Sequence, residues 1–253
     1  MWLFETPKTY SEMCTKISKS VFFISLIELF ILAQISPVFS GFMKVISFNT
    51  ETEVIGIKLY VAYIYVPIIL SVLENIFKLH DKMGRIIKLR KIFDGKVIFS
   101  AYIKELGITL PKSSVKPYKI YAESEELRSK ISSHFYYYVS STTPRIDEHY
   151  VHMALDSWCW VWILLDNIAI SLLLCIAAMA LKFSSLSISW WLMIGLFIYS
   201  ALLTGLLLLL LMTSCKSNSI NEVKAAVKED CENEKGKRNS ELKKEIENAL
   251  LNK

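Results

Sequence analysis

Four stretches of the chain are almost free of charged residues, and they limit the folds that the chain can adopt. They are residues 20–40, 55–77, 158–181 and 188–212. About 20 apolar residues in a helix cross the roughly 30 Å of hydrocarbon in a bilayer. Four such stretches in a chain of 253 residues, 53% of them hydrophobic, leave too little polar chain to cover them in a soluble core. We therefore expect an all-α polytopic membrane protein with four transmembrane helices.

The basic residues predict how such a protein is oriented. Of the 29 Lys and Arg residues, 26 fall before residue 20, in residues 78–156 or after Met212. The other side keeps only Lys44, Lys58 and Lys182. Basic residues favour the cytoplasmic side, so we expect a multi-pass protein of the inner (cytoplasmic) membrane with both termini in the cytoplasm.

These boundaries predict five segments. They are a cytoplasmic N-terminal segment (1–19), a first transmembrane hairpin (20–77), a cytosolic helical domain (78–156), a second transmembrane hairpin (157–212) and a charged cytoplasmic tail (213–253). In the tail, Leu242, Ile246, Ala249 and Leu250 share one helical face. That face suits either a contact with another subunit or a frayed, solvated helix.

The cytosolic domain is expected to consist of several helices. The second span should continue as a helix to Asp94, because polar and apolar residues alternate there at helical spacing. A short helix should end at Gly107, and another should begin after Ser124, a favourable N-cap. Four consecutive aromatic residues, 135–138, are too many for a solvated helix, so we expect them to pack on helix 86–99, on the membrane or on another subunit.

Basic residues are concentrated at the start of this domain. Residues 78–96 hold seven Lys and Arg against Asp81 and Asp94. One interpretation is attraction to anionic lipid at the cytoplasmic face. The alternative is a phosphate-bearing partner, such as a nucleotide-like ligand or a nucleic acid, held by a basic group. That candidate ligand- or lipid-binding group is Lys82, Arg85, Lys88, Arg90 and Lys91.

Polar residues also occur inside the predicted spans. Glu28 and Asp166 each lie about eight residues from the cytoplasmic start of a span, and Asn167 follows Asp166. A charged carboxylate at this depth costs at least about 2.5–3.5 kcal/mol, so such residues usually have a function. They could line an ion or proton pathway. They could equally form hydrogen bonds, together with Gln34, that hold the helices together.

A polar stripe leads toward these residues along one predicted helix, residues 143–181. Thr143 can cap this helix and Pro144 suits its first turn. At 100° per residue the helix aligns four polar residues with Asp166, and we expect them to couple the cytosolic domain to the span. This predicted coupling seam is Arg145, His149, His152 and Asp156.

The histidines allow a second interpretation. His134, His149 and His152 could hold a metal ion, and Arg128 with His134 fits the loose R-x(4–6)-H pattern of the HEPN ribonucleases. The spacing matches no recognised zinc signature, and no phosphate loop or nucleophile motif is present. We therefore assign no catalytic residue, no metal and no cofactor.

In span count and topology the chain resembles the small four-span membrane effector proteins of bacterial antiviral defence systems. That resemblance implies a non-enzymatic homo-oligomer whose cytosolic domain receives a ligand or a protein partner and whose spans alter membrane permeability. The alternatives are an ion- or proton-coupled channel or transporter that uses Glu28 and Asp166, and a membrane-anchored metal-dependent or RNase-like enzyme that uses His134, His149 and His152.

Overall fold

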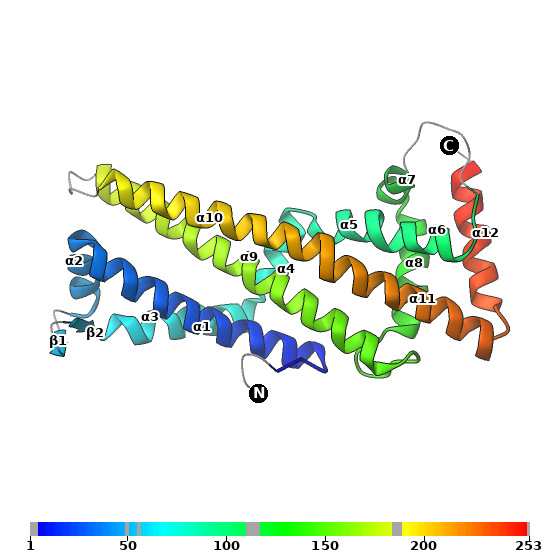
Figure 1. The fold of residues 1–253 in the computed structure, drawn as a ribbon, viewed down its shortest axis with the longest axis horizontal. Helices are drawn as coiled ribbons and strands as arrows, with labels where there is room; N and C mark the ends of the chain where they lie inside the picture. The colour runs from blue at the N-terminus through cyan, green and yellow to red at the C-terminus, as the bar shows by residue number, and fades with distance from the viewer. Residues whose placement is uncertain (1–4, 49–50, 55–56, 110–116, 184–188, 252–253) are drawn as a thin grey trace. The chain divides into compact units, whose positions relative to one another are not determined.

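A computed structural model describes residues 5–48, 51–54, 57–109, 117–183 and 189–251. Within these residues the chain is helical except for one two-stranded β-hairpin, which confirms the predicted all-α class (Figure 1). The chain divides into two compact units. We call them the apolar unit (Met1–Glu5, Cys14–Asp81 and Cys159–Leu209) and the charged unit (Thr6–Met13, Lys82–Trp158 and Leu210–Lys253).

The apolar unit is built from long apolar helices and the hairpin. Its elements are most of α1 (Tyr10–Ile35), α2 (Pro37–Ile46), β1 (Glu51–Val54), β2 (Ile57–Tyr60), α3 (Ala62–Phe77), the start of α4 (Leu79–Ile86), most of α9 (Glu148–Phe183) and α10 (Trp190–Leu210). In the described residues, three helices are long and apolar enough to cross a membrane, and the bent pair α3–α4 would make a fourth. The predicted membrane-protein class is thus supported by three to four candidate spans.

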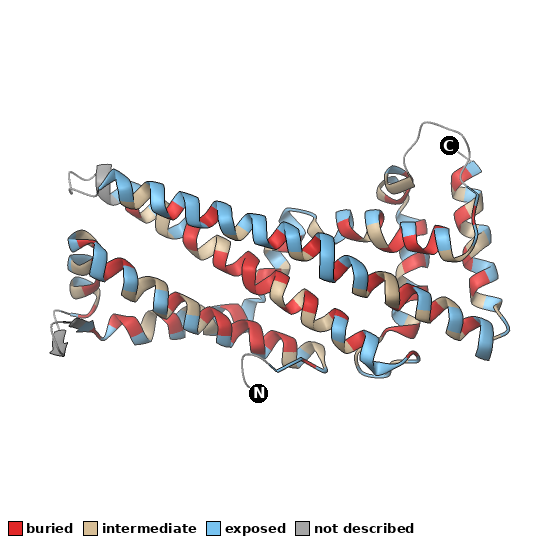
Figure 2. Ribbon diagram, viewed as in Figure 1, coloured by how far each residue is buried: buried red, intermediate tan, exposed pale blue. Residues whose placement is uncertain are grey.

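The surface of these helices is apolar as well. Large side chains such as Phe197 and Leu202 on α10 are 70% and 68% exposed, and exposed residues run along most of this helix (Figure 2). Apolar patches of this extent are unusual on soluble proteins and match a lipid-facing surface.

The first predicted span is shorter than expected at its end. Helix α1 stops at Ile35, because Ser36 adopts an extended conformation and Pro37 begins α2 at its first position. The Ser36 hydroxyl accepts a hydrogen bond from Phe39 N at 3.5 Å, which caps α2. Residues 57–60 form the second strand of the hairpin, in which Tyr60 pairs with Glu51, and the next helix begins at Ala62. The prediction that the stretch 55–77 is one helix was therefore wrong for residues 57–60.

The second predicted span does not continue straight to Asp94. Helix α3 ends at Phe77, the next residue Lys78 adopts a left-handed conformation (φ 46°), and α4 departs at 66°. Lys88 (φ 54°), two residues after the end of α4, adopts a left-handed conformation too. Neither residue is glycine, so no local stop signal marks these breaks.

Helix α9 begins later than predicted but is as continuous as predicted. Thr143 and Pro144 precede the helix, and the carboxylate of Asp147 instead accepts a hydrogen bond from His149 N at 2.9 Å. From Glu148 the helix runs unbroken for 36 residues.

The charged unit surrounds a separate hydrophobic core. Its remaining elements are α5 (Leu89–Phe93), η1 (Asp94–Ile98), α6 (Phe99–Glu105), α7 (Pro117–Glu123), α8 (Glu125–Tyr138), η2 (Leu211–Cys215), α11 (Lys216–Asn233) and α12 (Lys237–Leu251). The predicted stop at Gly107 (φ 61°) and the predicted Ser124 cap, which accepts from Leu127 N at 3.2 Å, are both confirmed. Phe135 and Tyr138, from the aromatic run, are buried in this core.

The C-terminal segment belongs to this core. On α11, Val223 is fully buried. On α12, Leu242, Ile246 and Leu250 are buried in the same core, where α12 packs against α7, α8 and α11. The apolar face of α12 is therefore covered by its own chain. Both predictions for this face, a contact with another subunit and a frayed, solvated helix, were therefore wrong.

Candidate ion site in the apolar unit

Three ionisable side chains meet inside the apolar unit. Glu74 on α3, His80 on α4 and Asp166 on α9 are only 2%, 1% and 4% exposed. One potential ligand atom from each residue lies within 4.8 Å of the other two. The break at Lys78 makes this possible, because it turns α4 so that His80 faces Glu74.

The imidazole of His80 is held on several sides. Its Nδ1 forms a hydrogen bond with Glu74 Oε1, and its ring packs against Trp162 with the ring centroids 5.5 Å apart. The thiol of Cys14 on α1 also interacts with it. Among the described residues, His80 Nε2 and Asp166 Oδ2 are buried and have no partner in hydrogen-bond geometry.

Polar residues extend from this cluster to two further helices. The side-chain amide of Asn167 donates to the Tyr199 hydroxyl on α10 at 3.3 Å. Tyr199 interacts with Glu28 on α1, although both carboxyl oxygens of Glu28 are buried without a partner in hydrogen-bond geometry in the described part of the chain. We call this set of residues the polar seam. It consists of Glu28, Glu74, His80, Asp166, Asn167 and Tyr199.

The seam contains three carboxyl groups and one imidazole. The buried cation on α1, Lys16, donates to the Glu5 carbonyl oxygen at 3.0 Å and lies over the Trp160 ring at 4.8 Å. An apolar surrounding disfavours uncompensated negative charge, so the seam requires bound protons or a bound cation.

The sequence identified part of this seam and missed the rest. Glu28, Asp166 and Asn167 are all members, as their unusual position in apolar stretches suggested. Glu74 and His80 lie within the helix that the sequence predicts to run straight to Asp94, and that prediction does not bring them together. A usable signal was the carboxyl group of Glu74 near the end of an otherwise apolar run, with a histidine six residues later.

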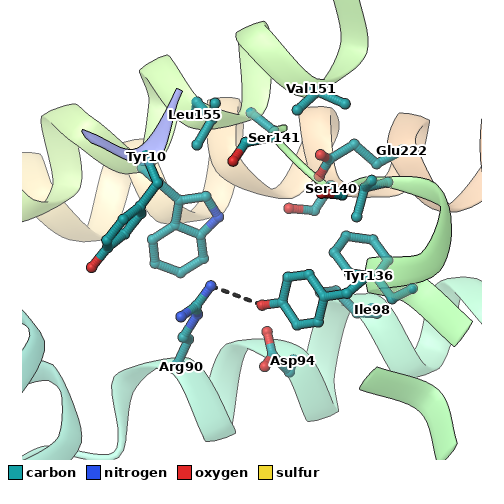
Figure 3. Close-up of a pocket in the computed structure, with 15 residues that line it drawn as sticks. Tyr10, Arg90, Asp94, Ile98, Tyr136, Ser140, Ser141, Val151, Leu155 and Glu222 are labelled. Atoms are coloured by element: carbon teal, nitrogen blue, oxygen red, sulfur yellow. Dashed lines mark hydrogen bonds between the residues drawn. The ribbon is translucent and has the colours of Figure 1, made fainter. Parts of the chain in front are cut away.

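The charged unit contains a cavity of about 480 Å³ (Figure 3). Arg90 and Asp94 extend into it from α5 and η1, and Arg90 Nη2 donates to the Tyr136 hydroxyl at 2.8 Å. Burial raises the pKa of Asp94 to about 6, and the charge of Arg90 offsets part of that rise. Glu222 of α11 supplies a buried carboxyl group to the lining, in addition to the half-buried Asp94.

The predicted basic group is only partly gathered at this cavity. Arg90 lines it. The other members are exposed on α4, on α5 or between these helices: Lys82, Arg85, Lys88 and Lys91.

The predicted histidine group is dispersed. His134 is buried in the charged unit, where its Nδ1 lies 3.0 Å from the Tyr102 hydroxyl and burial lowers its pKa. His149 is exposed and His152 is half-buried on α9, and within the described residues the three form no metal-ligand group. The Arg128 guanidinium donates to the Tyr121 and Ala122 carbonyl oxygens, at 3.2 and 2.6 Å. These contacts give His134 and Arg128 structural roles.

The predicted coupling seam is divided as well. Arg145 precedes α9, and its guanidinium lies 3.8 Å from the Tyr137 ring centre and 3.6 Å from Glu234 Oε1. His149, His152 and Asp156 lie on α9, outside the core of the charged unit. Their coupling role remains a prediction.

Comparison with known proteins identifies a family. The sequence model of the YmfE protein family matches residues 9–235, which include most of both units. Searches of curated proteins and of solved structures found no match. The family match does not bear on the resemblance to antiviral effectors, which stays a prediction. Because the match extends over most of its length, the chain belongs to the YmfE protein family.

Proposed function

We propose that this protein is a non-enzymatic integral membrane protein that handles a cation, a proton or a metal ion, at the polar seam. The observation that carries this proposal is the buried cluster of Glu74, His80 and Asp166 among apolar helices. Ionisable groups at such positions are costly and commonly mark ion or proton pathways.

The extent of the seam supports a pathway more than a single structural contact. Its residues come from α1, α3, α4, α9 and α10. One group joins Glu74, His80 and Asp166, and a second group joins Asn167, Tyr199 and Glu28. One hydrogen bond between two helices would suffice to hold them together. The seam contains three carboxyl groups, which is more than a contact between two helices needs. In the described structure, Glu28 and Asp166 also have buried carboxyl oxygens without a hydrogen-bond partner.

Ion flux in proteoliposomes tests this proposal. Wild-type protein should carry protons or cations down an imposed gradient, measured with a pH-sensitive dye and a membrane-potential dye. Asp166→Asn and Glu28→Gln should each reduce the flux by at least about tenfold, because they remove the titratable group and keep the shape. Glu126→Gln, at an exposed position of the charged unit, is the matched control. Equal flux from both seam variants and wild type would refute the proposal.

A second candidate function is that the charged unit receives a small anionic ligand. The supporting observation is the cavity, in which Arg90 presents a guanidinium beside Tyr136. Arginine binds phosphate and carboxylate groups in a bidentate manner. Inorganic phosphate and ATP should each be tested as probes by thermal shift. A rise in Tm for wild type that is absent in Arg90→Gln supports a phosphate-bearing ligand, and no rise with either probe contradicts it.

A further inference from the structure

The cluster at the centre of the seam has the chemistry of a transition-metal site. Metal–nitrogen and metal–oxygen bonds of about 2.0–2.2 Å place two ligand atoms of one ion roughly 3–3.5 Å apart. One potential ligand atom from each of Glu74, His80 and Asp166 lies within 4.8 Å of the other two, so small side-chain movements would bring them around one ion. Each residue comes from a different helix, and all three side chains are buried.

Unpartnered atoms point to the same conclusion independently. A buried polar atom without a hydrogen bond costs about 1–3 kcal/mol. In the described structure, His80 Nε2 and Asp166 Oδ2 are two such atoms, and both belong to residue types that bind metals. Native structures contain few atoms of this kind, and an ion is one of the common explanations.

The charge of the cluster favours a divalent ion. Two carboxylates and a neutral imidazole carry two negative charges, which one dication neutralises. This neutrality matters in the apolar unit, where an isolated charge is poorly solvated.

The ligand types restrict the class of ion. Mg²⁺ and Ca²⁺ prefer sites made entirely of oxygen ligands. One imidazole with two carboxylates instead suits Mn²⁺, Fe²⁺, Co²⁺ or Zn²⁺.

We propose that Glu74, His80 and Asp166 bind one divalent transition-metal ion per chain inside the apolar unit. This inference rests on the proposed function, because it names the class of cation that the polar seam handles. It also predicts that the purified protein binds the ion stoichiometrically, whether or not the ion is transported.

Metal binding to purified full-length protein in mild detergent tests the site. Protein stripped with EDTA is incubated with Zn²⁺ or Co²⁺, desalted and analysed by elemental mass spectrometry. Wild type should retain about one equivalent. Glu74→Gln, His80→Ala and Asp166→Asn should each weaken binding by at least about tenfold. His149→Ala, which removes an exposed histidine of the charged unit, should bind as wild type does.

A spectroscopic measurement on wild type covers the case in which a variant does not fold. Co²⁺ bound by imidazole and carboxylates gives a visible absorption band, and X-ray absorption of the Zn²⁺ form should report nitrogen and oxygen neighbours near 2.0–2.2 Å. Wild type that retains no metal overturns the site. Folded Glu74→Gln and Asp166→Asn variants that both bind with wild-type affinity overturn it too, since the residues would then be joined by hydrogen bonds alone.

Flux measured with and without EDTA separates this inference from the proposed function. Proton flux that persists in EDTA, from protein that binds no metal, retains the proposed function and refutes the metal site. Stoichiometric binding with no flux of any cation retains the metal site and refutes the proposed function.

Discussion

Two carboxylates of the charged unit, the buried Asp230 and the half-buried Asp94, differ in the partners that surround them. Asp230 is fully buried, and its two oxygens accept hydrogen bonds at 2.8 Å from the Tyr138 hydroxyl and from Asn239 N. It therefore joins α11 to α8 and α12. Asp94 lies beside the Arg90 charge at the cavity, where burial raises its pKa. The first carboxylate stabilises the fold, and the second destabilises it once ionised.

Replacing Asp230 should be strongly destabilising. Asp230→Ala leaves the Tyr138 hydroxyl and Asn239 N without acceptors in a buried site, and each orphaned donor costs about 1–3 kcal/mol. We expect a loss of about 3 kcal/mol, measured as a lower Tm by tryptophan fluorescence in detergent. Glu232→Ala is the control, because Glu232 is exposed and its pair with Lys228 at 3.7 Å contributes under about 1 kcal/mol. Equal Tm values for the two variants would contradict the assigned role of Asp230.

Replacing Asp94 should be stabilising, in a manner that depends on pH. Its pKa is about 6 in the folded protein and near 4 in an unfolded chain. Between these values the folded state binds more protons, so wild type loses stability as pH rises from about 4 to 6. Asp94→Asn should therefore match wild type near pH 4 and exceed it by about 2 kcal/mol at pH 7. Thermal melts of both proteins across this range check it, and a Tm difference independent of pH would count against a raised pKa.

Helix α12 shows how a sequence element can be recognised while its role is not. Its apolar face is visible in the sequence, but only the fold reveals that Ile246 is fully buried against α8 and α11 in one core. The same pattern would suit a contact with another subunit. The two roles differ in whether another subunit or the same chain covers the apolar face of α12. The covering residues include those of α8, which lie more than a hundred positions away in the sequence.

The burial of α12 predicts a clear contrast on one helix. Ile246→Ala removes a fully buried side chain and should cost about 2–4 kcal/mol. Leu251→Ala, at a position 77% exposed on the same helix, should change stability by less than about 0.5 kcal/mol. Hydrogen exchange of the charged unit should rise in the first variant and stay unchanged in the second. Comparable small effects would favour a frayed helix.

At the scale of the whole molecule, four of the described helices contain residues of both units. They are α1, α4, α9 and the continuous helix from Trp190 to Asn233. In α9 and in the helix from Trp190 to Asn233, charged residues are more frequent in the part that belongs to the charged unit than in the part that belongs to the apolar unit. Basic residues are concentrated in the charged unit, which predicts that this unit lies in the cytoplasm.

Cysteine labelling tests this orientation. Cys231 is exposed in the charged unit, while Cys14, Cys159 and Cys215 are buried. A membrane-impermeant maleimide should label Cys231 only after the membrane is permeabilised. In a Cys231→Ser background, Ser189→Cys, at an exposed position before α10, should be labelled in intact spheroplasts. The Cys231→Ser protein is the background control, and the opposite labelling pattern would reverse the orientation.

Local sequence signals predicted the local structure well. Hydrophobic runs identified the long apolar helices, and Ser124 and Gly107 marked a helix start and a helix end. Polar residues in those runs identified Glu28 and Asp166 as members of the polar seam. Each of these depends on neighbours within a few positions, because capping, left-handed glycine and helical periodicity are local effects.

The tertiary structure alone decided the site and the composition of the core. Glu74, His80 and Asp166 meet because Lys78 adopts a left-handed conformation that nothing in its immediate sequence requires. Likewise, α12 is buried because distant helices cover it. Both outcomes depend on long-range packing. Packing offsets the local free-energy cost of positive φ at Lys78, which is not a glycine, and it determines which helices cover the apolar face of α12.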